Sequence, residues 1–421
     1  MSDSTPTRSV RFRLLAALAL AGVLAASFCE DWQLVTTGGS IDYRNRITGA
    51  RVMAQGMDPF HYKWRSGGPE ELCDPFNNLA MKVSLTTVTP TALLLMLPIA
   101  ELSYRDAQVV WLVIEWLCLL GSGALWWRLL EPGWKRWAWA ALIVGFSHTL
   151  AWKHHVDRGQ IYILLGLLVA LWVTLVRERR SGWAGVVAGL LLCLRPPVLL
   201  LLVPFIWMRD RAQWRAAVVS TCVFALLPLA FRGSIWTDYL SGMKGWSELQ
   251  RHGDKPRPPA QKYPATVEGI EIDKLALHHV RQYADSSIIR ILKGQGVVDF
   301  PEWPLGLALA AGIGGWFWWR RNAGETTLLV GFVVWFFLTD WFLPAYRNPY
   351  NDVLVLGVLA LALQTGRRAF WLALFGLPAG WLLYQIMPTA RWQIFIPTVL
   401  LLTGAIGLLL PKLTDRKAGR A

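Results

Sequence analysis

The chain has 421 residues, of which 54% are hydrophobic and only 17% charged, and it contains 25 tryptophans. Water-soluble proteins of this length rarely have such a composition, so water-soluble classes are excluded and a membrane protein is predicted. The formal net charge of +14 would suit a nucleic-acid partner. Lysine and arginine, however, lie in short clusters between apolar runs, where they act as topology signals, so we expect no nucleic-acid partner.

Several apolar runs approach the roughly 20 residues that cross a hydrocarbon core. They include residues 14–28, 109–130, 161–176, 218–231 and 327–343. Residues 1–28 are predicted to contain an N-terminal segment and the first transmembrane helix. Because the first run is short and ends in small residues, a cleavable signal peptide is the alternative.

Basic clusters between the apolar runs predict the topology. If all of them face the cytoplasm, the positive-inside rule also places both termini inside. Residues 87–100 then form a short helix of an outer loop, and residues 183–208 form a hairpin. The tip of this hairpin is Leu194-Arg195-Pro196-Pro197, and consecutive prolines suit a turn because they disfavour helix continuation.

The predicted fold class is therefore an all-α polytopic membrane protein, a bundle of about 12 transmembrane helices with extracytoplasmic loops. Residues 29–106 would be the first extracytoplasmic loop with interfacial helices, and residues 107–231 the following transmembrane helices. Residues 232–302 would be a large extracytoplasmic loop, and residues 303–421 the C-terminal transmembrane helices. The expected location is a bacterial plasma membrane, with the polar loops on the extracytoplasmic side.

Several polar side chains fall on the predicted outer side. Arginines on this less basic side are explained by an anion that they bind, since guanidinium suits phosphate oxygens; the alternative is that they reach to lipid headgroups. The residues expected to bind substrate are Arg195, Arg158, Gln160, Arg347, Asp58, His61 and His155.

Asp42 follows Gly38-Gly39-Ser40 and opens a segment with helical spacing of apolar residues. Its carboxylate could act as a general base or as an ordinary helix N-cap. Asp58 precedes Pro59 and has a turn role as its alternative.

The sequence predicts neither a metal nor a cofactor, because the adjacent His154 and His155 have no third ligand at fixed spacing. Cys29 and Cys73 both fall in the predicted first loop, where a disulfide and two free thiols are both open.

Two carboxylates lie inside predicted spans, where ionisable groups are costly. Glu115 is expected to be a hydrogen-bonding partner between helices. Asp340 is expected to pair with Arg347 or Arg391.

Short motifs in this order resemble a known family. Asp42-Tyr43 with the later run 56–60 (GMDPF), then Gly159-Gln160, then residues 184–189 (AGVVAG) before Arg195-Pro196, resemble polyprenol-phosphate-mannose-dependent mannosyltransferases of the GT-C superfamily, which include the mycobacterial phosphatidylinositol-mannoside enzymes. The resemblance extends over most of residues 10–365. Two departures are a single proline, Pro90, where the family has a pair, and an arginine at 195 where it usually has lysine.

The resemblance implies a multi-helical membrane fold, a lipid-phosphate-sugar donor, inverting transfer and an extracytoplasmic site, with Asp42 as the catalytic base. Together with the residues, it predicts a hexosyltransferase that moves mannose or another hexose from a polyprenyl-phosphate donor to a lipid or glycan acceptor among membrane lipids. A transporter or lipid flippase is the alternative. Such a protein would be expected to show an internal repeat with interrupted helices in both halves, and the two halves here differ.

Overall fold

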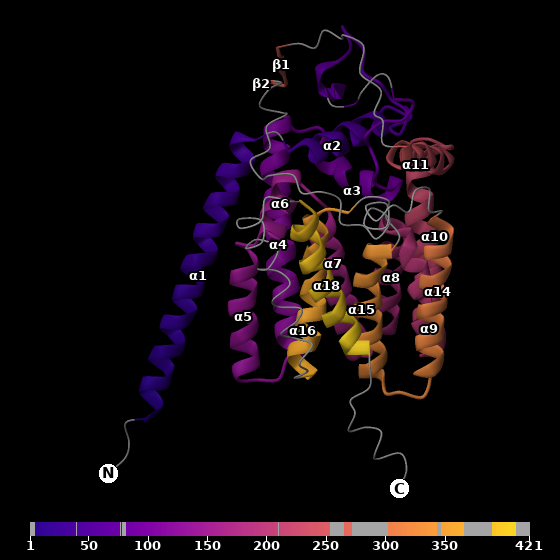
Figure 1. Cartoon of the computed structure of the whole chain (residues 1–421). Helices are drawn as coiled ribbons and strands as arrows, with labels where there is room; N and C mark the ends of the chain where they lie inside the picture. The colour runs from indigo at the N-terminus through magenta and orange to yellow at the C-terminus, as the bar shows by residue number, and fades with distance from the viewer. Residues whose placement is uncertain are drawn as a thin grey trace.

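The computed structural model describes residues 5–38, 40–75, 77, 81–208, 210–252, 265–271, 302–342, 347–365 and 390–409. Most of them form a bundle of upright helices, and short elements cover one end of it (Figure 1). We call this the cap end; it carries α2 (Ile41–Ala54), α3 (Pro90–Ala100) and α11 (Ile235–His252). Helix α1 (Thr5–Thr37) begins at the opposite end.

The other elements follow in chain order. They are η1 (Glu70–Leu72), α4 (Tyr104–Leu129), α5 (Trp134–Phe146), α6 (Leu150–Arg158), α7 (Tyr162–Arg177), α8 (Ser181–Leu194), η2 (Pro196–Leu202), α9 (Val203–Trp207), α10 (Arg211–Leu226), η3 (Leu227–Ala230), β1 (Thr266–Val267), β2 (Ile270–Glu271), α14 (Glu302–Trp319), α15 (Glu325–Phe342), η4 (Pro349–Leu354), α16 (Val355–Thr365) and α18 (Ala390–Leu409). Within the described part of the chain, β1 and β2 are the only strands.

Four helices in the described ranges are long and apolar enough to cross a membrane: Arg13–Thr37, Tyr104–Leu129, Arg211–Ala230 and Glu325–Phe342. The bent pair of α6 and α7 would make a fifth span. The prediction of an all-α membrane protein is confirmed, whereas the predicted number of about 12 transmembrane helices is not. Several of the expected spans are helices of fewer than 18 residues, such as α8 and α16, and residues 366–389 lie outside the described part.

The predicted end of the first transmembrane helix at residue 28 is wrong, because α1 continues to Thr37. The polar residues that follow position 28 suggested a loop, but Asp31 is fully buried against neighbouring helices. Its carboxylate lies 2.7 Å from Lys153 Nζ and accepts hydrogen bonds from the indole N–H groups of Trp116 and Trp152. A buried charge is tolerated when it is paired and hydrogen-bonded in this way, so the helix continues through it.

The segment 87–100 contains an 11-residue helix, α3. At a rise of 1.5 Å per residue, such a helix is about 16 Å long, roughly half of a hydrocarbon core. The Thr89 side chain caps its first turn by accepting a hydrogen bond from the Ala92 N–H. The expectation of a short helix that is not a full span agrees with this element.

Helices α8 and α10 pack closely through two glycines spaced four residues apart. A Cβ added to Gly185 would lie 2.3 Å from the Gln213 carbonyl oxygen, and one added to Gly189 would lie 2.0 Å from Ser220 Oγ. Glycines at this spacing allow the close helix contact typical of membrane bundles. Helix α8 ends at Leu194, and the chain continues as η2 from Pro196, so the predicted break lies where the paired prolines stand.

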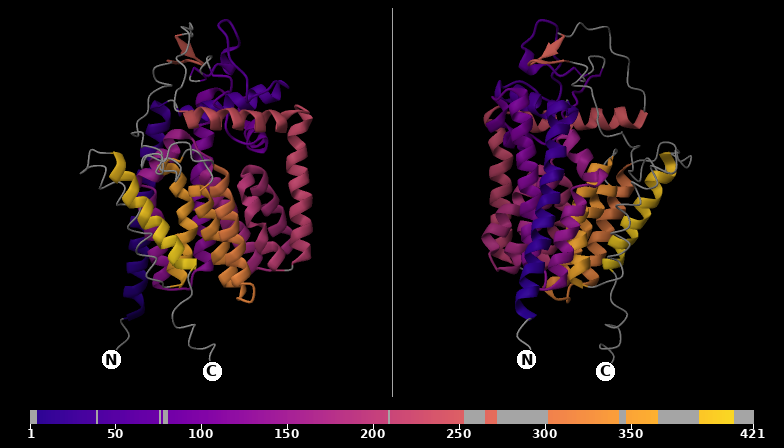
Figure 2. Two further views of the ribbon diagram at one scale, coloured as in Figure 1. Left: turned by 45° about the vertical axis from the view of Figure 1, so that its right-hand side comes forward. Right: turned by 90° about the vertical axis from the view of Figure 1, so that its left-hand side faces the viewer.

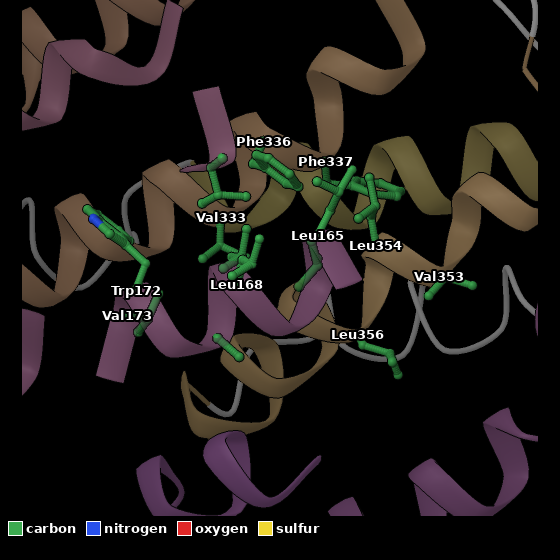
Figure 3. Close-up of a cluster of buried hydrophobic side chains, with 14 of the residues drawn as sticks. Leu165, Leu168, Trp172, Val173, Val333, Phe336, Phe337, Val353, Leu354 and Leu356 are labelled. Atoms are coloured by element: carbon green, nitrogen blue, oxygen red, sulfur yellow. The ribbon is translucent and has the colours of Figure 1, made fainter. Parts of the chain in front are cut away.

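The centre of the bundle is an apolar core between α7, α15 and the segment formed by η4 and α16 (Figure 3). Leu165, Leu168 and Trp172 from α7 face Val333 and Phe336 from α15. Trp172 also stacks on Phe332, with ring centroids 4.0 Å apart. This core holds the ends of α7 and α15 together, and those ends carry polar residues of the candidate site.

The predicted loop 232–302 contributes two described elements at the cap end. Helix α11 lies across this end of the bundle (Figure 2). Strands β1 and β2 form a hairpin whose turn residues Glu268 and Gly269 both have positive φ angles, as a type I′ hairpin turn requires. The Glu268 carboxylate forms ion pairs with the buried guanidinium groups of Arg44 and Arg51 on α2. The hairpin is thereby attached to the helix that carries Asp42.

Candidate active site

Asp42 lies in the first turn of α2, and its carboxylate faces the connection between α6 and α7. It accepts hydrogen bonds from Gln160 Nε2 at 2.5 Å and from Arg158 Nη1 at 3.4 Å. The Asp42 side chain is 24% exposed, so one carboxylate is both held in position and accessible. The N-cap alternative for Asp42 is wrong, because Ser40 occupies that position.

The connection between α6 and α7 is a sharp elbow of 113°, and we call residues 158–161 the elbow. Gly159 at its centre has φ +59°, in the left-handed region that favours glycine. A Cβ at Gly159 would also lie 2.6 Å from the Cβ of Tyr43. The Gly159-Gln160 motif therefore lets the elbow approach α2 closely enough for Gln160 to reach Asp42.

Arg46 lies beneath this contact, one helical turn after Asp42. Its guanidinium donates to the Gly159 carbonyl oxygen and to Gln160 Oε1. Since Oε1 of Gln160 accepts from Arg46, its amide nitrogen is directed at Asp42. The sequence analysis missed Arg46. Its position four residues after Asp42, on the same helix face, is the signal that could have found it.

His155 is fully buried on α6 and is hydrogen-bonded to the chain just after the elbow. Its Nε2 accepts a hydrogen bond from the backbone N–H of Ile163, 3.1 Å away, so the proton of the neutral ring lies on Nδ1. That Nδ1 is 3.1 Å from Oε1 of Glu115, which is also buried. Glu115 of α4 thus lies against α6, although neither Glu115 Oε1 nor His155 Nδ1 makes a hydrogen bond within the described residues, and its role as a hydrogen-bonding partner between helices stays a prediction.

A second charged cluster surrounds Asp340 near the end of α15. Its carboxylate is fully buried and pairs with Arg195 and with Arg347, whose Nε is 3.2 Å away. Asn351 Nδ2 donates to the same carboxylate at 3.2 Å, and Arg347 also pairs with Asp352. The predicted pairing of Asp340 with Arg347 agrees with this geometry. The side chain of Arg391 lies outside the described residues.

Aromatic side chains connect the two clusters. The Arg195 guanidinium lies over the ring of Tyr162, 5.6 Å from its centroid, and Tyr162 begins α7 directly after the elbow. The Tyr162 ring contacts Tyr350 of η4, which contacts the ring of His154 on α6. The elbow therefore lies between the Asp42 cluster and the Asp340 cluster. The polar residues along this line are Arg158 and Gln160 at the elbow, and Arg195 and the buried Arg347 beside Asp340.

Asp58 and His61 lie beyond the other end of α2. Because α2 has 14 residues, its two ends are about 20 Å apart. Asp58 Oδ1 accepts from the Phe60 N–H in a turn, and its Oδ2 is 2.8 Å from His61 Nδ1. The structure does not bring this pair to Asp42, and it shows the turn role that was the alternative for Asp58.

Cys29, Cys73 and the half-buried Lys63 are further ionisable groups toward this end of the molecule. Cys29 and Cys73 are free, so the disulfide alternative is wrong: Cys29 is an exposed residue of α1 and Cys73 is buried. Burial raises the pKa of Cys73 to about 12, and burial lowers the pKa of Lys63 to about 8. Within the described ranges, no group of three or more His, Cys, Asp or Glu side chains could hold a metal ion.

A family model for glycosyltransferase family 87 matches residues 87–344, which is more than half of the chain. The chain belongs to glycosyltransferase family 87. This is a GT-C-type family, so the predicted GT-C-type membrane glycosyltransferase is confirmed at that level. No curated protein and no solved structure matches the chain.

The matched region contains the elbow, Glu115, Arg195 and Asp340, but not α2 or Arg347. Membership of glycosyltransferase family 87 therefore indicates glycosyl transfer and favours it over the transporter alternative.

Proposed function

We propose that this protein transfers mannose or another hexose from a polyprenyl-phosphate-linked donor to a hydroxyl of a lipid or glycan acceptor, with inversion. The transfer would take place at the extracytoplasmic face of a bacterial plasma membrane, at the cap end of the bundle. The observation that carries the proposal is the accessible Asp42 carboxylate beside Arg158, in a chain that belongs to a glycosyltransferase family.

Asp42 is proposed as the general base. A base must lie within hydrogen-bonding reach of the acceptor hydroxyl, and the carboxylate must be exposed to admit it. Gln160 and Arg158 hold the carboxylate from one side, and Gln160 is itself held by Arg46. Because these groups are already held in place, little orientational freedom has to be given up as the transition state forms.

Arg158 is proposed to bind the donor phosphate. Its Nη1 contacts Asp42, whereas its Nε–H is buried without a hydrogen-bond acceptor among the described residues. A buried donor without a partner costs about 1–3 kcal/mol. A phosphate oxygen would satisfy this donor, and a charge-assisted bond from guanidinium to phosphate is among the stronger hydrogen bonds in proteins.

In the proposed reaction the acceptor oxygen attacks the anomeric carbon from the face opposite the phosphate. The bond between this carbon and the phosphate oxygen breaks, and the leaving polyprenyl phosphate keeps the electron pair. The hydroxyl proton passes to Asp42. Arg158 stabilises the negative charge that grows on the leaving phosphate, and this differential stabilisation lowers the barrier.

The test uses the purified protein in lipid with radiolabelled polyprenyl-phosphate sugars and a membrane-lipid extract as acceptor. We expect labelled product from the wild type and about a 100-fold lower rate from Asp42→Asn, with donor binding largely retained. Asp106→Asn is the matched control, because Asp106 is an exposed aspartate in the first turn of α4 at the same end of the bundle. Near wild-type transfer by a folded Asp42→Asn variant would remove Asp42 as the base.

A further inference from the structure

At the end of the bundle opposite the cap end, an open cavity of about 680 Å³ lies between α1 and α5. Figure 1 shows α1 slanting away from the bundle toward its first residues, beside α5. The cavity is lined on α1 by Arg13, Ala19 and Leu20 and on α5 by Trp134 and Trp137, among others. Its volume lies within the range of about 300–1,000 Å³ typical of small-molecule sites.

The lining of this cavity changes character along α1. Small and branched apolar side chains form its wall over most of its length, and Arg13 lies at the start of the candidate span. Trp134, at the first residue of α5, is 68% exposed. Tryptophan and arginine at the end of a span are typical of the level of lipid headgroups. The cavity is thus apolar in its body and cationic and aromatic at its mouth.

The charge at the mouth has no acidic partner among the described residues. Glu131, two residues before the lining residue Gly133, pairs with Lys135 at 2.8 Å. Arg13 is exposed and makes no hydrogen bond or ion pair within the described part of the chain. An amphipathic ligand with a negative headgroup would complement both parts of this site.

The ligand cannot be the sugar donor in its reacting position. Asp42 follows the other end of α1, and the 25 residues of the candidate span extend about 37 Å at 1.5 Å per residue. This length exceeds the roughly 30 Å of a hydrocarbon core, so the cavity lies at the level of the other leaflet. Basic clusters predict that leaflet to be cytoplasmic, where anionic lipids attract arginine.

We propose that the cavity between α1 and α5 is a binding site for an anionic phospholipid of the leaflet opposite the candidate active site. One acyl chain would lie along Ala19 and Leu20, and the headgroup phosphate would contact the Arg13 guanidinium. This proposal does not depend on the proposed function, because it rests on the cavity, its charge and its place along a membrane-spanning helix.

The test is native mass spectrometry of the full-length protein released from detergent after titration with phosphatidylglycerol or phosphatidylcholine. The wild type should retain one phosphatidylglycerol at about five-fold lower lipid concentration than phosphatidylcholine, as expected for one arginine near an anionic headgroup. Arg13→Gln should remove this preference. Ala19→Trp should fill the cavity and weaken retention of both lipids.

Arg215→Gln is the matched control, since Arg215 is an exposed arginine on α10, away from the cavity. Thermal unfolding of each variant without added lipid checks that it is folded; Arg13 and Ala19 are both exposed, so neither change disturbs the core. Equal retention of the two lipids by the wild type, or a preference that survives Arg13→Gln, would overturn the proposal. A dimer that Ala19→Trp dissociates would instead assign the cavity to a second copy of the chain.

Discussion

Replacing Gly159 by alanine tests whether the close contact between the elbow and α2 holds the candidate site together. The new Cβ would lie 2.6 Å from the Cβ of Tyr43, whereas carbon atoms in contact are normally about 3.5–4.0 Å apart. Tyr43 cannot easily move, because it is buried, its hydroxyl donates to the Ala107 carbonyl oxygen, and its ring stacks on Trp111. The elbow and α2 must therefore separate by about 1 Å.

Two costs add in the Gly159→Ala variant. An L-residue in the left-handed region costs about 1–2 kcal/mol, and overpacking a close contact costs about 1–3 kcal/mol. We expect the free energy of unfolding to fall by about 2–5 kcal/mol. A displacement of this size would also lengthen the bond from Gln160 to Asp42, and a misplacement of about 1 Å at a catalytic group can lower the rate about 100-fold.

The assay compares thermal unfolding and sugar transfer of Gly159→Ala with those of Gly166→Ala in the same lipid. Gly166 lies within α7, and a Cβ added there meets no atom within 4 Å. Its replacement should leave transfer unchanged and stabilise the helix by up to about 1 kcal/mol. If both variants unfold and transfer alike, the elbow does not position Asp42 and the reasoning is refuted.

Arg195→Ala leaves the buried Asp340 with fewer partners and should destabilise the fold by about 3–5 kcal/mol, and adding Asp340→Asn should restore much of that stability. If Arg195 binds the donor phosphate as predicted from the sequence, the double variant will bind donor more weakly than the wild type in a filter-binding assay, although its stability is restored. Wild-type donor affinity of the double variant would remove Arg195 from the site. The half-buried ammonium group of Lys63 should make the protein more stable as pH rises from about 8 toward 10.5, because over this range the unfolded chain holds the proton and the folded chain does not. Thermal unfolding between pH 7 and 10 should show the wild type gaining on Lys63→Gln, and parallel curves would contradict the shift. Glu268→Gln removes the charge between two arginines of α2, so limited proteolysis should cut near the hairpin faster than in the wild type, and an unchanged rate would show that the ion pairs do not hold it.

Local patterns in the sequence determined much of the fold. Hydropathy identified an all-α membrane protein, because apolar runs of bilayer length have no other stable solution than helices or closed barrels. The break after Leu194 follows from the paired prolines, because proline disfavours helical geometry in the residue before it and donates no backbone hydrogen bond to the preceding helix. Gly159 suits the connection between α6 and α7, since glycine adopts the left-handed conformation found there. Each of these signals acts within a few residues and does not depend on the rest of the chain.

Charge pairs between distant residues were decided only by the tertiary structure. The first transmembrane helix was predicted to end at position 28 because the apolar run ends there, yet the helix continues past the charged Asp31, beside which Lys153, more than 100 residues later, lies in the bundle. Asp42 was selected from its sequence context, but its contact with Gln160 and the support from Arg46 require α2 to pack on the elbow. Whether a charged group ends a helix, caps it or is held for chemistry depends on which partner desolvates and pairs with it, and that partner is chosen by the packing of helices far apart in the sequence.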